Sequence, residues 1–420
     1  MSCGPWWCCI LDVERLAWNA VTNACRAAQE LASSRAMNVE VGVDPTLTVN
    51  AFESLTHLRI NGKRPEVWSP YSAFFPANDG WVRTHANYPH HKEALTRALG
   101  PDIRAVIAET SADDIERKVN AERGVAVTVR TPEEWAIEPH AISTKTEPWV
   151  GTKINGSTRD FYLNPTEPLA GVRILDLTRV IAGPVCSQIL SCLGADVLRI
   201  DPPGRPELAE LYLSSGMGKQ SVELDFNGFD RRQIDELVES SDVVLLGYRP
   251  GALDRFGLNK FDLVERFPHL ILASLSAWGE CGPWAGRPGF DSVVQAATGI
   301  ASLCGTSRRP GALPVQVLDH ATGYRMAAEI LSFLANRNSG TITISLLGAA
   351  RTLLGYSVLP EKIETSAVLV TPEVNAMGFN VDSIHVQTVP PALTINSRPL
   401  FRSLTKYGAA DIGWYRRRRQ

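Results

Sequence analysis

One acidic residue lies where a nucleophile could be held. Asp319 follows the apolar residues of PVQVL and precedes the amphipathic stretch HATGYRMAAEILSFLANR. A carboxylate at such a predicted strand-to-helix turn is held rigidly, is partly desolvated and lies near the positive end of a helix, as a nucleophile would. Asp at this place can equally serve only as the cap of the following helix. The segment alone leaves both roles open.

Cations and an aromatic residue beside glycine turns suggest a phosphorylated ligand. Lys219 lies in MGKQSVELD, and Gly247, Tyr248 and Arg255 lie in LLGYRPGALDRFG. Lys and Arg donate charge-assisted hydrogen bonds to phosphate, and a tyrosine ring can stack on a flat base. The alternative is structural: Arg255 pairs with the adjacent Asp254, and Tyr248 fills a core.

The segment VRILDLTRVIAGPVCSQILSCLGADVLRID has the spacing of a nucleotide-binding βαβ unit. Its second predicted strand ends at Asp201, an acid that could bind a ribose hydroxyl. The glycine fingerprint GxGxxG is absent, and only Gly183 would let the backbone approach a pyrophosphate, so a nicotinamide or flavin cofactor is weakly supported. A generic mononucleotide-like ligand at this turn remains open.

Predicted strands and helices alternate from about residue 169 to 347. VRILDL, ADVLRI, SVELD, DVVLLGY, LILASLSAW and TITISLL are typical of strands, while CSQILSCLG, FDRRQIDELVES, DSVVQAATGIASL and GYRMAAEILSFLAN are typical of helices. Alternation of this kind predicts an α/β fold with a doubly wound parallel sheet. A ligand is then expected at the carboxyl ends of the strands.

The flanking regions differ in texture, which suggests three parts: 1–165, 166–357 and 358–420. The first contains predicted helices near 12–36, 91–99 and 112–122, and a strand-like WVRTHANY. Residues 138–167 are rich in Pro, Thr, Gly and Asn, which is typical of a linker. Beyond Tyr356 the pattern weakens, and the sequence predicts no architecture for the tail.

Composition excludes several classes of protein. The 420 residues carry a formal net charge of -3 with 21% charged and 44% apolar residues, so neither nucleic acid nor membrane is an expected partner. The terminal RRRR is most simply a solvated end. No stretch approaches a membrane span, and the N-terminus lacks the basic start of a signal peptide. We expect an intracellular protein, most simply cytoplasmic, with mitochondrial and peroxisomal locations left open.

Cysteine and histidine spacing gives no metal site. The eight cysteines form no CxxC pair, which favours free thiols in a reducing compartment. His85, His90 and His91 in THANYPHH invite a metal interpretation, but no acidic or cysteine partner lies at ligand spacing. We therefore predict no metal.

Five motifs occur in an order that is recognisable. PLAGVRILDLTRVIAGPVCSQILSCLGADVLRIDPPG, GKQSVELD, YRPGALDRFGL, SAWGECGPWAGRPGFDSVVQAATGI and PVQVLDHATGYRMAAEILSFLANR follow one another between about residues 168 and 347. In this arrangement the chain resembles the family III CoA-transferases, which include formyl-CoA and carnitine CoA-transferases and α-methylacyl-CoA racemases.

The resemblance implies a fold, a ligand and a reaction. It implies a Rossmann-like CoA-binding domain with a second, smaller α+β domain, in chains interlocked as a homodimer. Acyl-CoA and a carboxylic acid acceptor would be the partners, and Asp319 would be the nucleophile in CoA transfer between carboxylic acids. The residues that would line the CoA pocket are Val180, Ala182, Leu224, Gly247, Tyr248, Arg255 and Phe256, with Lys219 as a phosphate contact.

Two departures from the family pattern leave alternatives. The racemases pair the aspartate with a histidine in a GHD-like triplet, whereas this chain has Gly289, Phe290 and Asp291, and phenylalanine cannot accept a proton. Racemisation would need another base, for which His320 is a candidate, although adjacent side chains on a helix do not face each other.

The order of the parts also departs from the family. SPYSAFFPANDGWVRTHANYPHHKEALTRALG resembles the family's large domain, which normally follows the CoA-binding half but here precedes it, as in rearranged double-length fungal members. The residues after Tyr356 do not resemble a second large domain. A non-catalytic CoA-binding protein is therefore a further alternative.

Overall fold

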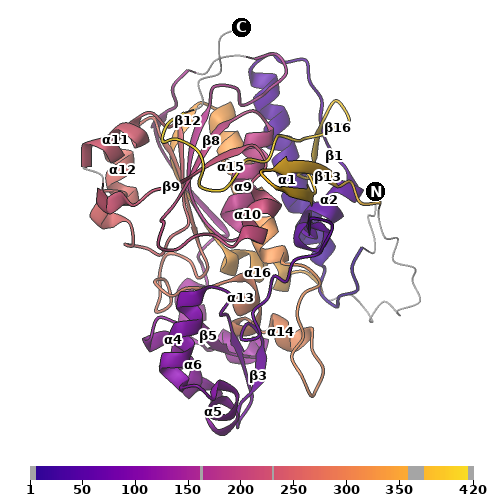
Figure 1. The fold of residues 1–420 in the computed structure, drawn as a ribbon, viewed down its shortest axis with the longest axis vertical. Coiled ribbons are helices and arrows are strands. Elements are labelled where there is room, and N and C mark those ends of the chain that lie inside the picture. Colours follow the sequence, from indigo (N-terminus) through magenta and orange to yellow (C-terminus); the bar gives the residue numbers. More distant parts are fainter. Residues whose placement is uncertain (1–5, 161–163, 229–230, 358–372, 415–420) are drawn as a thin grey trace.

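A seven-stranded sheet lies at the centre of the protein (Figure 1). The computed structural model describes residues 6–160, 164–228, 231–357 and 373–414. The strand order is β6–β12–β11–β10–β7–β8–β9, and only the β6 pairing is antiparallel among the ladders of this sheet in the described ranges. The strands are β6 (Val150–Ser157), β7 (Arg173–Leu177), β8 (Asp196–Asp201), β9 (Lys219–Glu223), β10 (Val243–Leu246), β11 (Ile271–Ser276) and β12 (Asn338–Ser345).

The chain winds outward from β7 in both directions. β8 and β9 lie on one side of β7, and β10, β11 and β12 follow on the other. The predicted α/β sheet of mostly parallel strands is thus confirmed, with the expected strands shifted only at their ends. The order reverses between β7 and β10, and ligands of such sheets bind outside the carboxyl ends of the strands at this point.

Helices cover both faces of the sheet (Figure 1). One face is covered by α9 (Ala182–Cys192) and α15 (Val317–Ala335), with α1 (Val13–Ser34) packed along α15. The other is covered by α11 (Arg231–Glu239) and α12 (Lys260–Arg266), whose Ile234 and Leu263 lie in a second apolar core. Because α15 lies between the sheet and α1, it is buried nearly all round, which explains its weak amphipathicity.

The helix predicted for residues 291–303 is two helices in the structure. α13 (Asp291–Ala297) ends before Gly299, and α14 (Ile300–Leu303) begins after it. Gly299 has φ +90°, and a Cβ there would lie 2.4 Å from the backbone nitrogen of Pro132. The break therefore depends on a residue without a side chain.

The linker predicted for 138–167 is wrong over much of its length. Residues 150–157 form β6, the antiparallel edge strand beside β12, and Pro139–Thr144 forms α8. The polar composition of β6 misled the prediction because most of its side chains are solvent-exposed. Residues 150–157 thus belong to the central sheet.

A smaller unit of the N-terminal region packs below the main sheet, beside α13 (Figure 1). A three-stranded antiparallel sheet, β3–β4–β5, is covered by three helices around Ile107 and Val119. The helices expected near 12–36, 91–99 and 112–122 are all present. The elements are β3 (Phe74–Pro76), β4 (Trp81–Thr84), α4 (Pro89–Leu99), α5 (Ile103–Glu109), α6 (Ala112–Ala121) and β5 (Ala126–Thr128).

The C-terminal tail has strands that the sequence did not predict. β13 (Met377–Val381) and β14 (Ile384–Thr388) form a hairpin that continues onto β2 (Arg59–Ile60), and β15 (Leu393–Ile395) lies between β1 (Val41–Val43) and β16 (Arg398–Pro399). Strands from the N-terminal region and from the C-terminal tail thus pair in the same two sheets. The terminal RRRR lies outside the described residues.

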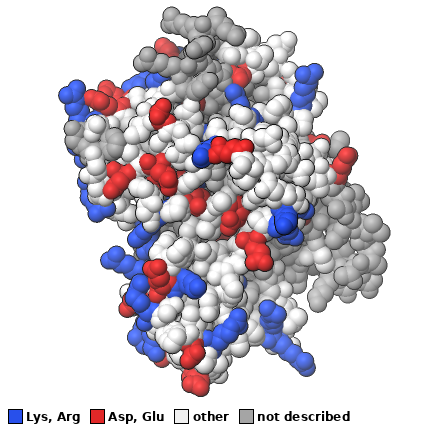
Figure 2. Space-filling model, in the orientation of Figure 1, with Lys and Arg blue, Asp and Glu red and all other residues white. Residues whose placement is uncertain are grey.

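Short helices connect these parts. They are α2 (Pro45–Phe52), α3 (Ser54–His57), α7 (Pro132–Ala136), α10 (Ala209–Ser215), η1 (Phe226–Gly228), η2 (Asp254–Phe256) and α16 (Leu346–Leu354). In the part of the chain that the structure describes, no helix is long and apolar enough to cross a membrane. Figure 2 shows Lys and Arg interspersed with Asp and Glu on one face of the molecule.

Candidate active site

A cleft of about 210 Å³ opens at the carboxyl ends of β7, β10 and β11. The turn after β7 contributes Arg179 and Val180, and the turn after β10 contributes Gly247, Tyr248 and Arg249. The remaining walls come from α9, α15, the β11–α13 loop and the start of α4. The cleft thus lies where the doubly wound sheet predicts a ligand.

Asp319 lies in the first turn of α15, with only 5% of its surface exposed, and lines the cleft. The residues before it form no strand, so the predicted strand-to-helix turn is a loop-to-helix turn. The N-cap of α15 is Gln316, so Asp319 is inside the helix and does not cap it. Burial, followed by the charge of Asp291, raises the pKa of Asp319 well above its usual value.

Asp291 holds the start of α15 in place. Its Oδ2 accepts a hydrogen bond from the backbone N–H of Asp319 at 3.0 Å, and its Oδ1 accepts one from the side-chain amide of Gln295. Asp291 itself begins α13 and is almost fully buried. Burial raises the pKa of this carboxyl, which therefore shares a partly protonated site with Asp319.

Phe290 stacks on a histidine from the N-terminal region. The rings of His85 and Phe290 lie 3.6 Å apart at an angle of 7°. Burial, together with His91 and Arg83, lowers the pKa of His85 well below its usual value, so its imidazole is neutral. Its Nδ1 is buried and has no hydrogen-bond partner among the described residues.

His320 does not share the cleft with Asp319. Its ring packs against Phe52 at 5.1 Å, and burial lowers its pKa to about 3. It lines a separate small cavity beside Tyr324. The hypothesis that His320 replaces the missing base is therefore wrong in this structure, for the helical geometry already noted.

Val180 adopts a strained backbone conformation at the floor of the cleft, with φ +71°. Its N–H donates to Glu207 Oε2 at 2.9 Å, and the other oxygen of Glu207 accepts from the Tyr88 hydroxyl at 2.5 Å. Burial alone would raise the pKa of Glu207, but Arg199 and Arg179 lower it overall. This charged carboxylate fixes the turn that lines the cleft.

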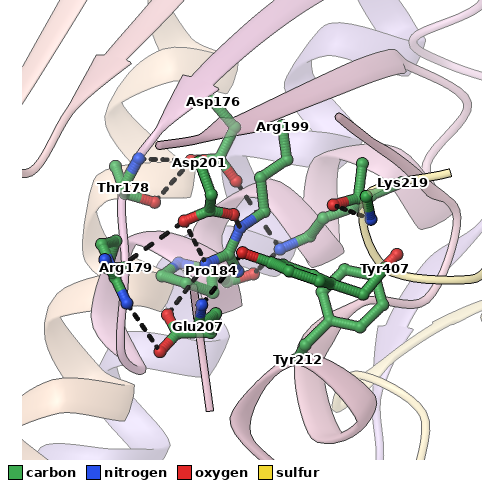
Figure 3. A network of polar contacts seen from close by, with 12 residues as sticks. Asp176, Thr178, Arg179, Pro184, Arg199, Asp201, Glu207, Tyr212, Lys219 and Tyr407 are labelled. Carbon is green, nitrogen blue, oxygen red and sulfur yellow. Dashed lines mark hydrogen bonds and ion pairs between the residues drawn. The ribbon is translucent and has the colours of Figure 1, made fainter. Parts of the chain in front are cut away.

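The Glu207 carboxylate belongs to a larger buried ion-pair network (Figure 3). Arg199 donates to Asp201 at 2.7 Å and to Glu207 at 2.8 Å, and all three side chains are fully buried. Asp201 therefore pairs with an internal cation, and the interpretation of Asp201 as a ribose-binding acid is wrong. The network is structural support beneath the cleft.

Lys219 also faces the interior. Its Nζ donates to the carbonyl oxygen of Pro184 at 2.7 Å and lies 3.7 Å from Asp176 Oδ2, with no exposed surface (Figure 3). Burial lowers its pKa to about 8. The assignment of Lys219 as a phosphate contact is therefore wrong in this structure, because its ammonium group is bound to partners inside the core.

The other predicted residues divide into two groups. Val180, Ala182, Gly247 and Tyr248 line the same cleft as Asp319. The remaining residues lie elsewhere: Leu224 packs in the core beneath α11, and Arg255 lies 4.5 Å over the ring of Phe256 in η2. They do not line the cleft in the described structure.

Several lining residues were missed from the sequence. The cations are Arg179, Arg205, Arg249 and Arg287, and the aromatic side chains from the N-terminal region are Tyr88, His90 and His91. Arg249 directly follows Tyr248 and could have been found as a cation after a strand. Tyr88 and the two histidines come from a different part of the chain, and their sequence carries no signal of this contact.

The cleft combines cations with a buried carboxyl group. Arginines at the ends of parallel strands suit phosphate groups, and Asp319 lies at the inner end of the same space. In the described parts of the chain, no group of three His, Cys, Asp or Glu side chains is arranged to hold a metal ion. The fold and cleft define an α/β protein with a ligand site at its strand ends.

Comparison with known proteins identifies the family. Residues 169–378, half of the chain, match the family described as CoA-transferase family III. The chain therefore belongs to the family III CoA-transferases, and the resemblance stated from the motifs is confirmed.

The curated relatives match only in part. A probable fatty acyl-CoA transferase from Mycobacterium tuberculosis is 38% identical over 189 residues, covering 41% of this chain and 48% of the relative. A formyl-CoA:oxalate CoA-transferase from Escherichia coli is 31% identical over 184 residues, covering 40% and 44%. The chain thus spans about half the length of the curated relatives it matches.

Solved structures of similar proteins cover comparable shares. A crystal structure of the mycobacterial protein has 36% identity and a TM-score of 0.42, over 45% of this chain and 56% of its own. A CAIB/BAIF family protein from Brucella suis has 26% identity and a TM-score of 0.41, over 52% and 65%.

Proposed function

We propose that this protein transfers CoA between carboxylic acids, with Asp319 as the covalent nucleophile. The observation that carries the proposal is that Asp319 lines one cleft together with Val180, Ala182, Gly247 and Tyr248. Four of the predicted CoA contacts and the predicted nucleophile, which are far apart in sequence, are thus brought to the same space. Membership of the family supports CoA thioesters as substrates.

In the proposed reaction, the Asp319 carboxylate carries each covalent intermediate in turn. An oxygen of ionised Asp319 attacks the thioester carbonyl, the C–S bond breaks, and CoA leaves as thiolate while an acyl-aspartyl anhydride remains. The thiolate then attacks the Asp319 carbonyl carbon and releases the donor carboxylate. The acceptor carboxylate attacks this aspartyl-CoA thioester, and the freed thiolate takes up the new acyl group and regenerates Asp319.

The cleft offers binding groups for the CoA half of the substrate. Arg205, Arg249 and Arg287 can neutralise its phosphates, and Tyr248 offers a ring on which its base can stack. The first turn of α15 places the positive end of a helix beside Asp319, where it favours the ionised carboxylate that attacks. The homodimer implied by the family resemblance stays a prediction.

Intact-protein mass spectrometry tests the nucleophile directly. After incubation with an acyl-CoA, we expect an acyl or CoA adduct that hydroxylamine removes, located at Asp319 by peptide mapping. Asp319→Asn should form none, while Asp411→Asn, which alters an exposed carboxyl, should react as the unaltered protein does. An adduct that persists in Asp319→Asn would overturn the assignment.

A second candidate is proton exchange at the α-carbon of an acyl-CoA. It is favoured by His85, a neutral imidazole that stacks on Phe290 and lines, together with Asp319, a small cavity separate from the cleft. A base and an acid on one cavity are what such exchange requires. Deuterium uptake from D₂O into 2-methylacyl-CoA, lost in His85→Gln, would establish it, and no uptake would exclude it.

A further inference from the structure

A small inner cavity opens beside Asp319, behind the cleft. It measures about 30 Å³ and is lined by residues of the N-terminal region, such as Leu55 and Trp68, and by later residues such as Phe290. Asp319 and Val180 line both this cavity and the cleft. The carboxyl group therefore lies where a thioester bound in the cleft would direct its acyl group inward.

The wall of the inner cavity is mainly apolar and carries no cation. Leu55, Val67 and Leu211 are aliphatic, and His85 is neutral. One polar group of the wall has its partners within the protein: Asn87 accepts from Ser72 and donates to the carbonyl oxygen of Val67.

One arginine contacts this wall without lining the cavity. The Arg83 guanidinium donates to Ser292 Oγ at 3.1 Å and lies over the Trp68 ring, 5.9 Å from its centroid, but Arg83 is not among the residues that line the inner cavity. The four arginines that line the cleft, Arg179, Arg205, Arg249 and Arg287, do not line the inner cavity. An acyl group bearing a second carboxylate would thus enter without a counterion.

A second cavity lies next to the first. It measures about 20 Å³, shares Leu55, Val180 and Leu211 with the inner cavity and is also lined by Tyr324 and Pro390. A cavity of roughly 10–15 Å³ by this measure holds one water-sized group, so the two together have room for a few methylene-sized groups. The space is small, and the second cavity adds uncharged polar side chains, among them Gln188 and Ser214, to the aliphatic ones.

Resting on the proposed function, we propose that the acyl donor carries a short, uncharged, aliphatic acyl group of about two to four carbon atoms. The carbonyl carbon lies at Asp319, and the chain points past Val180 between Leu55 and Leu211. Dicarboxylic acyl groups are disfavoured by the missing counterion, and long chains by the small volume of the two cavities.

Binding to the unreactive variant tests this inference separately from the chemistry. Calorimetry with Asp319→Asn compares CoA with acetyl-, propionyl-, butyryl-, octanoyl- and succinyl-CoA. We expect affinity to rise about fourfold for each methylene up to butyryl, and succinyl-CoA to bind at least about tenfold more weakly than butyryl-CoA. Equal affinity across the series, or tightest binding of succinyl- or octanoyl-CoA, overturns the inference.

Truncation of the wall provides a second measurement. Trp68 is 45% exposed, so Trp68→Ala in the Asp319→Asn background should open the cavity and raise octanoyl-CoA affinity relative to butyryl-CoA at least about fivefold. Phe261→Ala, which truncates an aromatic side chain exposed by 69%, is the matched control and should leave the ratio unchanged. If Trp68→Ala leaves the ratio of octanoyl-CoA to butyryl-CoA affinity unchanged, the acyl group does not bind in the inner cavity.

The two proposals fail in different ways. If the affinity ranking holds but no adduct forms on unaltered protein, CoA transfer through Asp319 falls and the acyl preference stands. If adducts form as readily with succinyl- or octanoyl-CoA as with butyryl-CoA, the acyl preference falls and the nucleophile stands.

Discussion

The carboxylate of Asp291 accepts a hydrogen bond from the backbone N–H of Asp319, with 3.0 Å between donor and acceptor. Two acids that lie at the starts of different helices, α13 and α15, are thereby buried as neighbours. Burial raises the pKa of both carboxyls, and the charge of Asp291 raises the pKa of Asp319 further. The folded protein retains protons here that the unfolded chain releases.

Stability should therefore decrease as pH rises. A carboxyl whose folded-state pKa exceeds its unfolded value of about 3.9 contributes stability fully below that value and loses it as pH passes the folded-state pKa. This pKa is about 6 for Asp291, and the pKa of Asp319 is also raised. Asp319→Asn removes one such group. The difference in free energy of unfolding between this variant and the unaltered protein should therefore favour the variant more at pH 8 than at pH 5. Urea unfolding at both pH values measures the difference.

A control separates this effect from general changes with pH. Asp411→Asn replaces an exposed carboxyl and should shift the unfolding midpoint equally at pH 5 and pH 8. If Asp319→Asn also gives the same shift at both values, the buried pair does not hold its protons as described.

Asp291 should set the pH at which Asp319 becomes a nucleophile. Asp291→Asn removes the repelling charge but keeps an oxygen that can accept from the Asp319 N–H, so the pKa of Asp319 should fall. Adduct formation rises with pH as Asp319 ionises, and its midpoint should move to lower pH in the variant. Single-turnover rates between pH 5 and 9 measure this profile, and a midpoint that stays or rises would contradict it.

Close contact between α9 and α15 should position Asp319. Gly323 is one helical turn beyond Asp319, and a Cβ there would lie 2.5 Å from the carbonyl oxygen of Ala182 and 2.9 Å from the Val185 Cβ. Gly323→Ala should push the helices apart, cost about 1–3 kcal/mol in free energy of unfolding and slow adduct formation. Gly80→Ala, where a Cβ meets nothing within 4 Å, is the control and should change neither quantity.

The sequence predicted the sheet because its signals are local. The buried strand ending at Leu246 is a continuous apolar run and the one ending at Leu177 is mostly apolar. The turns after them carry Val180 and Tyr248, so this part of the cleft could be inferred from pattern and family resemblance together. β6 was missed because an edge strand with exposed side chains has little apolar signal.

The rest of the site depends on long-range contacts. Tyr88 reaches the cleft and His85 the inner cavity from the N-terminal region, whose strands β4 and β5 pack on α13, and no local pattern reports this packing. Lys219 was misassigned for a related reason: its strand is buried, so the charged group pairs with Asp176 in the interior. Sequence spacing placed these residues near strand ends but could not show which way they point.

Tyr88 should stabilise the strained turn at Val180. Tyr88→Phe removes the hydroxyl that donates to Glu207 and leaves one oxygen of a buried carboxylate with fewer donors. We expect a loss of about 1.5–3 kcal/mol in free energy of unfolding and weaker binding of CoA, because Glu207 holds the Val180 N–H. Tyr71→Phe is the control. It alters a tyrosine whose ring lies against Lys92, and it should change CoA affinity little. If Tyr88→Phe bound CoA as tightly as the unaltered protein does, the ion-pair network would not influence CoA binding in the cleft.

Cys9 should be the most readily ionised thiol of those whose surroundings the structure defines. Its Sγ lies 3.8 Å from the Cys304 Sγ, and the hydrogen bond from Cys304 lowers the pKa of Cys9 to about 7. Burial raises the pKa of Cys186 and Cys192 instead. Because the thiolate is the reactive form, iodoacetamide at pH 7 should label Cys9 well before the two buried cysteines. Peptide mapping by mass spectrometry reports each site.

The donor can be removed to test the cause. Cys304→Ala deletes the hydrogen bond, so the pKa of Cys9 should return toward that of an ordinary thiol, and labelling at pH 7 should slow roughly tenfold. Cys281→Ala removes an exposed cysteine that contacts Glu147 and should leave the pH profile of Cys9 unchanged. A Cys9 profile that is the same in Cys304→Ala as in the unaltered protein would show that the thiol pair does not govern this ionisation.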